Sequence, residues 1–322
     1  MNFFGLLNKQ SSTDLVGLYL KPNGIGYAQV RKNSDQKLDI LACEFLDFEQ
    51  PDQQQEALEQ IVNSCNAKGA NCIAALSPQY VNIIHLETPK VENDELVSAI
   101  RWQLRDKIDF DPQLAAIAFI NMPGARQEVS TYINAIAVNQ QIIKEKIALI
   151  KPSGLNLSKI DITELAIKNF ALSINQDSGS GLAIIHLFLG QGVLQIIHNN
   201  QLYMTRRLGV GRDSFKIDPM NEMDPERQKK RVMDKLVLEI QRSLDYYESH
   251  FKNPPIQSVA LPPLEGKIPE FASYISTQLA LHAWTIDLNS QFTCHTDIDE
   301  PTQIECIPAI GTALSAFEGD AT

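Results

Sequence analysis

Residues 15–46 read LVGLYLKPNGIGYAQVRKNSDQKLDILACEFL, and residues 182–208, about half the chain away, read LAIIHLFLGQGVLQIIHNNQLYMTRRL. Each stretch holds an apolar strand, a short Gly-x-Gly turn, a second strand, a polar hairpin and a third strand. The turns are Gly24-Ile25-Gly26 and Gly190-Gln191-Gly192. Two copies of one strand-rich unit, each at the head of one half of the chain, predict two similar lobes with a cleft between them.

Composition limits the class of protein. The chain has 322 residues, is 44% hydrophobic and carries a formal net charge of −11. This length and balance fit about two globular domains, and the acidic charge argues against nucleic-acid binding, which depends on clustered Lys and Arg. The sequence contains no apolar run long enough to span a membrane and no recognisable signal peptide, so we expect a cytoplasmic protein.

The five cysteines argue against a metal or redox centre. Their number is odd, and the spacing of Cys65 and Cys72 fits no zinc or redox template. We therefore expect buried free thiols in a reducing compartment.

The order of predicted elements divides the chain. Between the two repeats, a strand, a helix over residues 91–107, two strands and a further helix predict an inserted α+β subdomain at about residues 79–155. Lobe 1 is expected over residues 1–178 and lobe 2 over residues 179–322. Lobe 2 would include a helical insertion at about residues 212–255, which contains a long helix that begins at a proline.

A polar link over residues 177–181 is expected to mark the boundary between the lobes. Apolar helix faces are expected at Leu58, Ile61 and Val62 in lobe 1, and in lobe 2 as a stripe formed by Val232, Leu236, Ile240, Leu244 and Tyr247.

Motifs of catalysis are missing from the sequence. It contains neither a P-loop nor Gly-x-Ser-x-Gly, and Gly24-x-Gly26 is too short for a dinucleotide fingerprint. His186 and His198 have no partners at metal-ligand spacing, so both are expected to be structural. The basic run over residues 227–231 is expected to be a solvated helix face. We therefore predict no catalytic residue and no metal site.

The segment LEIQRSLDYY, residues 238–247, resembles the Glu-Ile-x-Arg-Ser-Leu helix of the PilM family of type IV pilus assembly proteins. Further segments that are similar to the family follow in the family's order: residues 89–112 with Ile100-Arg101-Trp102, Thr205-Arg206, and residues 307–314. Within the family, the divergent MSHA-pilus branch is the most similar.

The resemblance implies an α/β, actin-like fold of the FtsA/PilM type, with two duplicated RNase H-like lobes and an inserted α+β subdomain. It implies a cytoplasmic adaptor that associates with the inner membrane through its partners and binds the N-terminal tail of a PilN-type membrane protein. Contacts with other platform or motor components and self-association stay open. Apolar anchors for an extended tail are expected on the subdomain, at Leu96, Ile100, Trp102 and Leu104.

The chain departs from the family at the nucleotide site. The family's Asp-Ile-Gly-x-Ser-Ser-x-Lys corresponds to residues 19–26, so Tyr19 replaces the Asp and Gly26 the Lys. The second Asp-Ile-Gly corresponds to residues 186–188, and the adenosine-contacting Gly-Gly to residues 261–264. Phosphate cradles use backbone N–H groups and Mg²⁺ uses carboxylates, and the prolines here supply no N–H.

We therefore expect a scaffold, not an enzyme, with no cofactor and with a degenerate nucleotide site around Asn23, Gly24, Gly190 and Gln191. The alternative is an ATP-binding switch or ATPase that uses a variant of that site. A GspL-like component of type II secretion shares the fold, but the transmembrane helix that follows in that protein is absent from this sequence.

Overall fold

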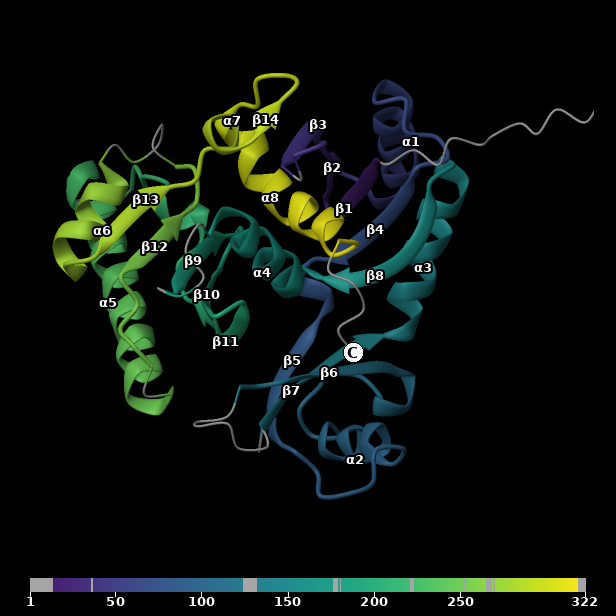
Figure 1. The fold of residues 1–322 in the computed structure, drawn as a ribbon, viewed down its shortest axis with the longest axis horizontal. Coiled ribbons are helices and arrows are strands. Elements are labelled where there is room, and N and C mark those ends of the chain that lie inside the picture. The colour runs from purple at the N-terminus through teal and green to yellow at the C-terminus, as the bar shows by residue number, and fades with distance from the viewer. Residues whose placement is uncertain are drawn as a thin grey trace, which may run out of the picture.

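The computed structural model describes residues 14–35, 37–123, 132–175, 179, 181–220, 223–251, 253–264, 268 and 270–317. Most of the predicted boundary at residues 177–181 lies outside them. The chain forms two sheet-based lobes and a smaller subdomain below the first lobe (Figure 1). In the described part of the chain, no helix is long and apolar enough to span a lipid bilayer.

The first sheet contains the first repeat. Strands β1 (Leu15–Lys21), β2 (Gly24–Lys32) and β3 (Leu38–Asp47) form an antiparallel meander, as predicted. Strands β4 (Asn71–Leu76) and β8 (Asn156–Ile162) extend it in parallel on the β1 side. The order is β14-β3-β2-β1-β4-β8, and the outer strand β14 (Thr293–Cys294) comes from near the C-terminus.

The second sheet repeats this plan in the order β11-β10-β9-β12-β13. Its meander is made by β9 (Leu182–Leu187), β10 (Gly192–His198) and β11 (Gln201–Leu208), and two parallel strands follow, β12 (Ser258–Leu261) and β13 (His282–Thr285). The predicted internal duplication is therefore present at the level of strand order and direction.

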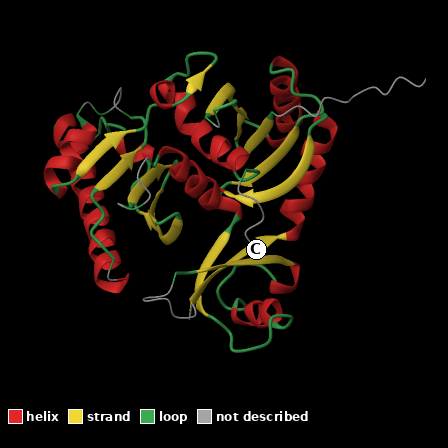
Figure 2. Cartoon of the chain, viewed as in Figure 1, coloured by secondary structure: helices red, strands yellow, loops and turns green. Residues whose placement is uncertain are grey.

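Helices cover the outer faces of both sheets (Figure 2). On the first sheet, α1 (Gln54–Ser64) and α3 (Gln140–Ile150) pack over the β1–β2–β4 face, and the predicted apolar face of α1 is buried. On the second sheet, α5 (Pro225–Phe251) and α6 (Phe271–Leu279) do the same. Of the predicted α5 stripe, four residues are buried: Leu236, Ile240, Leu244 and Tyr247.

Two further helices lie between the lobes. The α4 helix (Thr163–Ile174) and α8 (Glu300–Leu314) share a core with residues of both sheets. The approach of α8 depends on glycines: a Cβ on Gly17 would lie 1.9 Å from the Ala309 carbonyl oxygen, and one on Gly311 would lie 1.9 Å from that of Ala166. Because β14 and α8 pack on the first sheet, the C-terminal residues cross back from the second lobe.

The subdomain is a three-stranded sheet covered by one helix. Strands β5 (Asn82–Glu87), β6 (Ala115–Asn121) and β7 (Tyr132–Asn139) pair in the order β5-β7-β6. The helix α2 spans only Leu96–Gln103, shorter than predicted. After Trp102 the backbone forms tighter i→i+3 turns, so the helix ends there. The chain then folds back to β6, and the Arg101 guanidinium donates to the Ala115 carbonyl oxygen at 3.0 Å.

The remaining elements are short. They are α7 (Leu288–Gln291) and five 3-10 turns: Pro51–Gln53, Pro78–Tyr80, Pro112–Leu114, Lys151–Ser153 and Arg212–Phe215. All five cysteines are free thiols, but the expected burial holds only for Cys72 and Cys306, and the other three are half-buried.

Candidate functional site

The two Gly-x-Gly hairpins face each other across the cleft between the lobes. Residues of the β1–β2 turn, including Asn23, and of the β9–β10 turn, including Gln191, line one cavity there. The volume of the cavity is about 30 Å³. A water molecule needs roughly 10–15 Å³ by this measure, so the cavity has room for about two.

Aromatic and imidazole rings fill much of the cleft. The side chain of Tyr19 is 1% exposed, and its ring centroid lies 6.4 Å from that of Phe188. The Phe188 ring in turn contacts His186 edge-on at 4.6 Å between centroids. These rings occupy the positions at which the family's two Asp-Ile-Gly motifs would place carboxylate and glycine.

The ionisable groups among these rings are neutral at physiological pH. Burial raises the pKa of the Tyr19 phenol, and the charge of Glu305 adds to the increase. Burial lowers the pKa of His186 to about 3, with smaller contributions from the nearby cations Arg212 and Lys21. Neither side chain therefore offers an anionic ligand for a metal ion.

An ion cluster of three side chains closes the cleft, and we call it the Glu305 cluster. The Lys21 ammonium donates to both Glu305 carboxylate oxygens, at 2.8 and 2.9 Å. The Arg212 guanidinium donates to the same carboxylate. The side chains are 11%, 17% and 5% exposed for Lys21, Arg212 and Glu305. Burial lowers the pKa of Lys21, and the Glu305 charge opposes this effect.

The cluster joins the two halves of the molecule. Lys21 ends β1 and Glu305 lies on α8, both on the first sheet, whereas Arg212 follows β11 of the second sheet. No sequence pattern indicates the cluster, because the partners are 284 and 93 residues apart along the chain.

The predicted nucleotide residues lie at the two turns, but their backbones are engaged. The Gly190 N–H donates to the Asp213 carboxylate at 2.6 Å, so an acidic side chain already occupies that donor. A Cβ on Gly24 would lie 2.7 Å from the Phe45 ring. Asn23 and Gln191 do line the same cavity. The structure therefore brings the four predicted residues near one another without leaving space for a phosphate chain.

The residues present do not fit Mg-ATP. The carboxylate of Glu305 is already paired with two cations, and no group of three or more metal-ligating side chains occurs among the residues that the structure describes. The segment that corresponds to the adenosine contact is packed into the second lobe, with Leu261 and Leu264 0% and 1% exposed.

The predicted partner anchors have different environments. Ile100 and Leu104 are 0% exposed and form the core of the subdomain, and Leu96 packs against that core. Trp102 is 70% exposed. Of the four, only Trp102 has most of its side chain exposed.

No family model matches the chain, and no curated protein matches it either. Solved structures, in contrast, do match the chain. A structure of the PilM–PilN type IV pilus biogenesis complex is similar over 94% of this chain and 98% of that one, with 15% identity and a TM-score of 0.70. The cytoplasmic domain of EpsL, an inner-membrane component of the Vibrio cholerae type II secretion system, is similar over 92% and 94%, with 10% identity and a TM-score of 0.50.

The chain therefore has the α/β, actin-like ATPase fold, and this prediction is confirmed. Within that class its architecture is similar to that of PilM over nearly the whole length of both chains. At these identities the likeness defines the fold, and the biological role is a separate inference.

Proposed function

We propose that the protein is a PilM-type adaptor on the cytoplasmic face of an inner-membrane platform that assembles a type IV pilus. Its partner would be the N-terminal tail of a PilN-type membrane protein, and other platform or motor components would contact the same assembly. Full-length similarity to a PilM structure that was solved with PilN carries this proposal. The similarity to EpsL supports a cytoplasmic position at an inner-membrane complex.

Within that proposal we place the protein nearest to MshI of the MSHA-pilus branch, the divergent member of the PilM family that its sequence most resembles. In this assignment the protein acts as a scaffold and not as an enzyme. The small cavity and the paired Glu305 carboxylate support it.

The exposed Trp102 supports the subdomain as the partner surface. Other apolar side chains are also exposed there, among them Val91, Val97 and Leu114. A large indole that is 70% exposed has the character of a binding hot spot.

Calorimetric titration with a synthetic peptide of the PilN-type cytoplasmic tail tests the partner. Trp102→Ala should weaken binding by about 2 kcal/mol, or roughly 30-fold, without loss of thermal stability. Tyr246→Ala is the matched control, since it removes an aromatic ring that is 49% exposed on the second lobe. A folded wild-type protein that does not bind the peptide would contradict the proposal.

Titration with Mg-ATP tests the proposal that the protein is a scaffold without a working nucleotide site. We expect no heat of binding and no shift in melting temperature. Micromolar affinity, with turnover abolished by substitution of Asn23 or Gln191, would instead support the ATP-dependent switch.

A further inference from the structure

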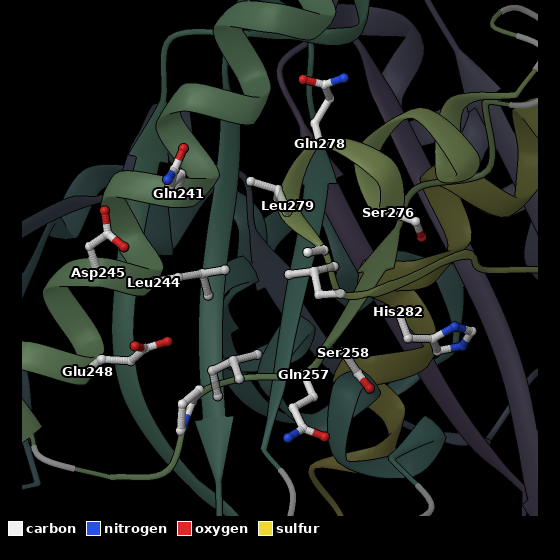
Figure 3. Close-up of a pocket in the computed structure, with 14 residues that line it drawn as sticks. Gln241, Leu244, Asp245, Glu248, Gln257, Ser258, Ser276, Gln278, Leu279 and His282 are labelled. Carbon is white, nitrogen blue, oxygen red and sulfur yellow. The ribbon is translucent and has the colours of Figure 1, made fainter.

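A second open surface lies on lobe 2, away from both the cleft and the subdomain. It is a groove of about 790 Å³, which we call the α5–α6 groove. The C-terminal half of α5 forms one wall, and the α6–β13 turn and the segment before β12 form the other (Figure 3). In Figure 1, α5 and α6 lie at the left of the molecule and α2 at the bottom, so the two surfaces are separate.

The groove combines an apolar floor with polar walls. Leu244 and Ile256 are 7% and 5% exposed and belong to the core of the second lobe. Around them lie groups that can bond the main chain of a bound segment: Gln241, Gln257, Ser258 and Gln278. This composition is typical of a site that takes a ligand with both apolar stems and polar groups.

The charge of the groove has one sign. Asp245 and Glu248 stand one turn apart on α5, and the described residues that line the groove include no Lys or Arg. Neither carboxylate forms an ion pair with a described residue. The α6 helix also ends at Leu279 beside the groove, and the C-terminus of its dipole adds partial negative charge.

We propose that the α5–α6 groove binds an extended, positively charged segment of a partner protein. The aliphatic stems of Arg or Lys would lie on the apolar floor, and their charged ends would reach Asp245 and Glu248. Alternating apolar residues would contact Leu244, and the amide side chains would bond the backbone.

A second copy of this chain fits less well as the occupant. Its own basic run lies on the rigid helix α5 rather than on an extended segment. Within that run, Lys229 and Lys230 are paired with Glu226 and Asp234. The proposal does not depend on the pilus role, because it uses a different surface.

Fluorescence anisotropy tests the groove with a labelled nonapeptide of alternating arginine and leucine. The control peptide carries citrulline, which has the shape of arginine without its charge. The full-length protein should bind the arginine peptide at least about tenfold more tightly, and the double variant Asp245→Asn/Glu248→Gln should lose this preference. The matched variant Asp52→Asn/Glu56→Gln removes two exposed carboxylates on lobe 1 and should bind as the wild type does.

Equal weakening in both double variants would show that the peptide responds only to the net charge, and would overturn the proposal. Unchanged binding by Asp245→Asn/Glu248→Gln would overturn it as well. Analytical ultracentrifugation without peptide tests whether a second copy of the chain occupies the groove. If the wild type self-associates and Asp245→Asn/Glu248→Gln abolishes this association, the groove belongs to a second copy. Loss of the pilus-tail interaction would leave all of these outcomes unaffected.

Discussion

Replacing Glu305 by Gln removes the charge that holds Lys21 and Arg212 in the cleft while keeping the size of the side chain. Removal of one partner from a buried ion pair costs about 3–5 kcal/mol, because the other charge is left uncompensated. Lys21 and Arg212 keep 11% and 17% exposure, and burial already lowers the pKa of Lys21. Partial hydration and loss of the Lys21 proton both relieve the cost, so we expect about 3 kcal/mol.

Differential scanning calorimetry measures this loss. At about 2–4 °C per kcal/mol for domains of this size, the midpoint should fall by about 6–12 °C. The control Glu226→Gln changes a carboxylate that is 80% exposed and paired with Lys229, and it should cost less than about 1 kcal/mol.

A double-mutant cycle separates the pair from its surroundings. Lys21→Met combined with Glu305→Gln should be more stable than the sum of the single changes by about 1 kcal/mol or more, since the second change removes the orphaned ammonium. Additive losses, or a midpoint for Glu305→Gln within about 2 °C of the wild type, would refute the idea that this cluster holds the cleft closed.

Two further predictions concern stability. His186 is neutral in the fold with a pKa of about 3, and the unfolded chain binds a proton below about pH 6.5. The stability contributed by His186 should therefore be fully present above pH 6.5 and fall by up to about 1.4 kcal/mol per pH unit toward pH 3. In urea titrations, His186→Gln should show a pH slope smaller than that of the wild type by this amount. Gly311→Ala should cost about 3 kcal/mol or more, because the new Cβ would lie 1.9 Å from the Ala166 carbonyl oxygen. Gly69→Ala meets no atom within 4 Å at φ +81° and should cost only about 1–2 kcal/mol in the same denaturation assay.

The meanders could be predicted because strand alternation and turn chemistry are local. Both repeats, the buried face of α1 and the stripe of α5 follow from residues a few positions apart. The predicted length of α2 was wrong. Its apolar residues keep helical spacing beyond Gln103, where the backbone already turns back toward β6.

It was harder to predict which surface a helix packs against than to predict the helix itself. Ile100 and Leu104 have the spacing of a helix face, but spacing alone does not say whether that face meets the subdomain's own sheet or a partner. The Glu305 cluster was missed for a related reason, since its members are distant in sequence and each is an ordinary charged residue by itself.

The glycines of the first turn acquire a structural explanation that the sequence did not offer. At Gly26, where the resemblance to the PilM family would place a Lys, a Cβ would lie 2.7 Å from the Glu305 carbonyl oxygen on α8. The close approach of α8 therefore depends on a glycine at this position. The same approach brings the Glu305 carboxylate to Lys21.

This coupling bears on how such a protein can be regulated. A ligand shifts a two-state equilibrium only by its differential affinity for the two states, and an exchangeable nucleotide does so in a working switch. Glu305 is covalently attached, so its concentration at Lys21 and Arg212 never changes. If the protein is the scaffold that we propose, the lobes would keep one relation at all nucleotide concentrations. A signal that alters them would then come from a partner that binds the subdomain or the α5–α6 groove more tightly when the Glu305 cluster is broken.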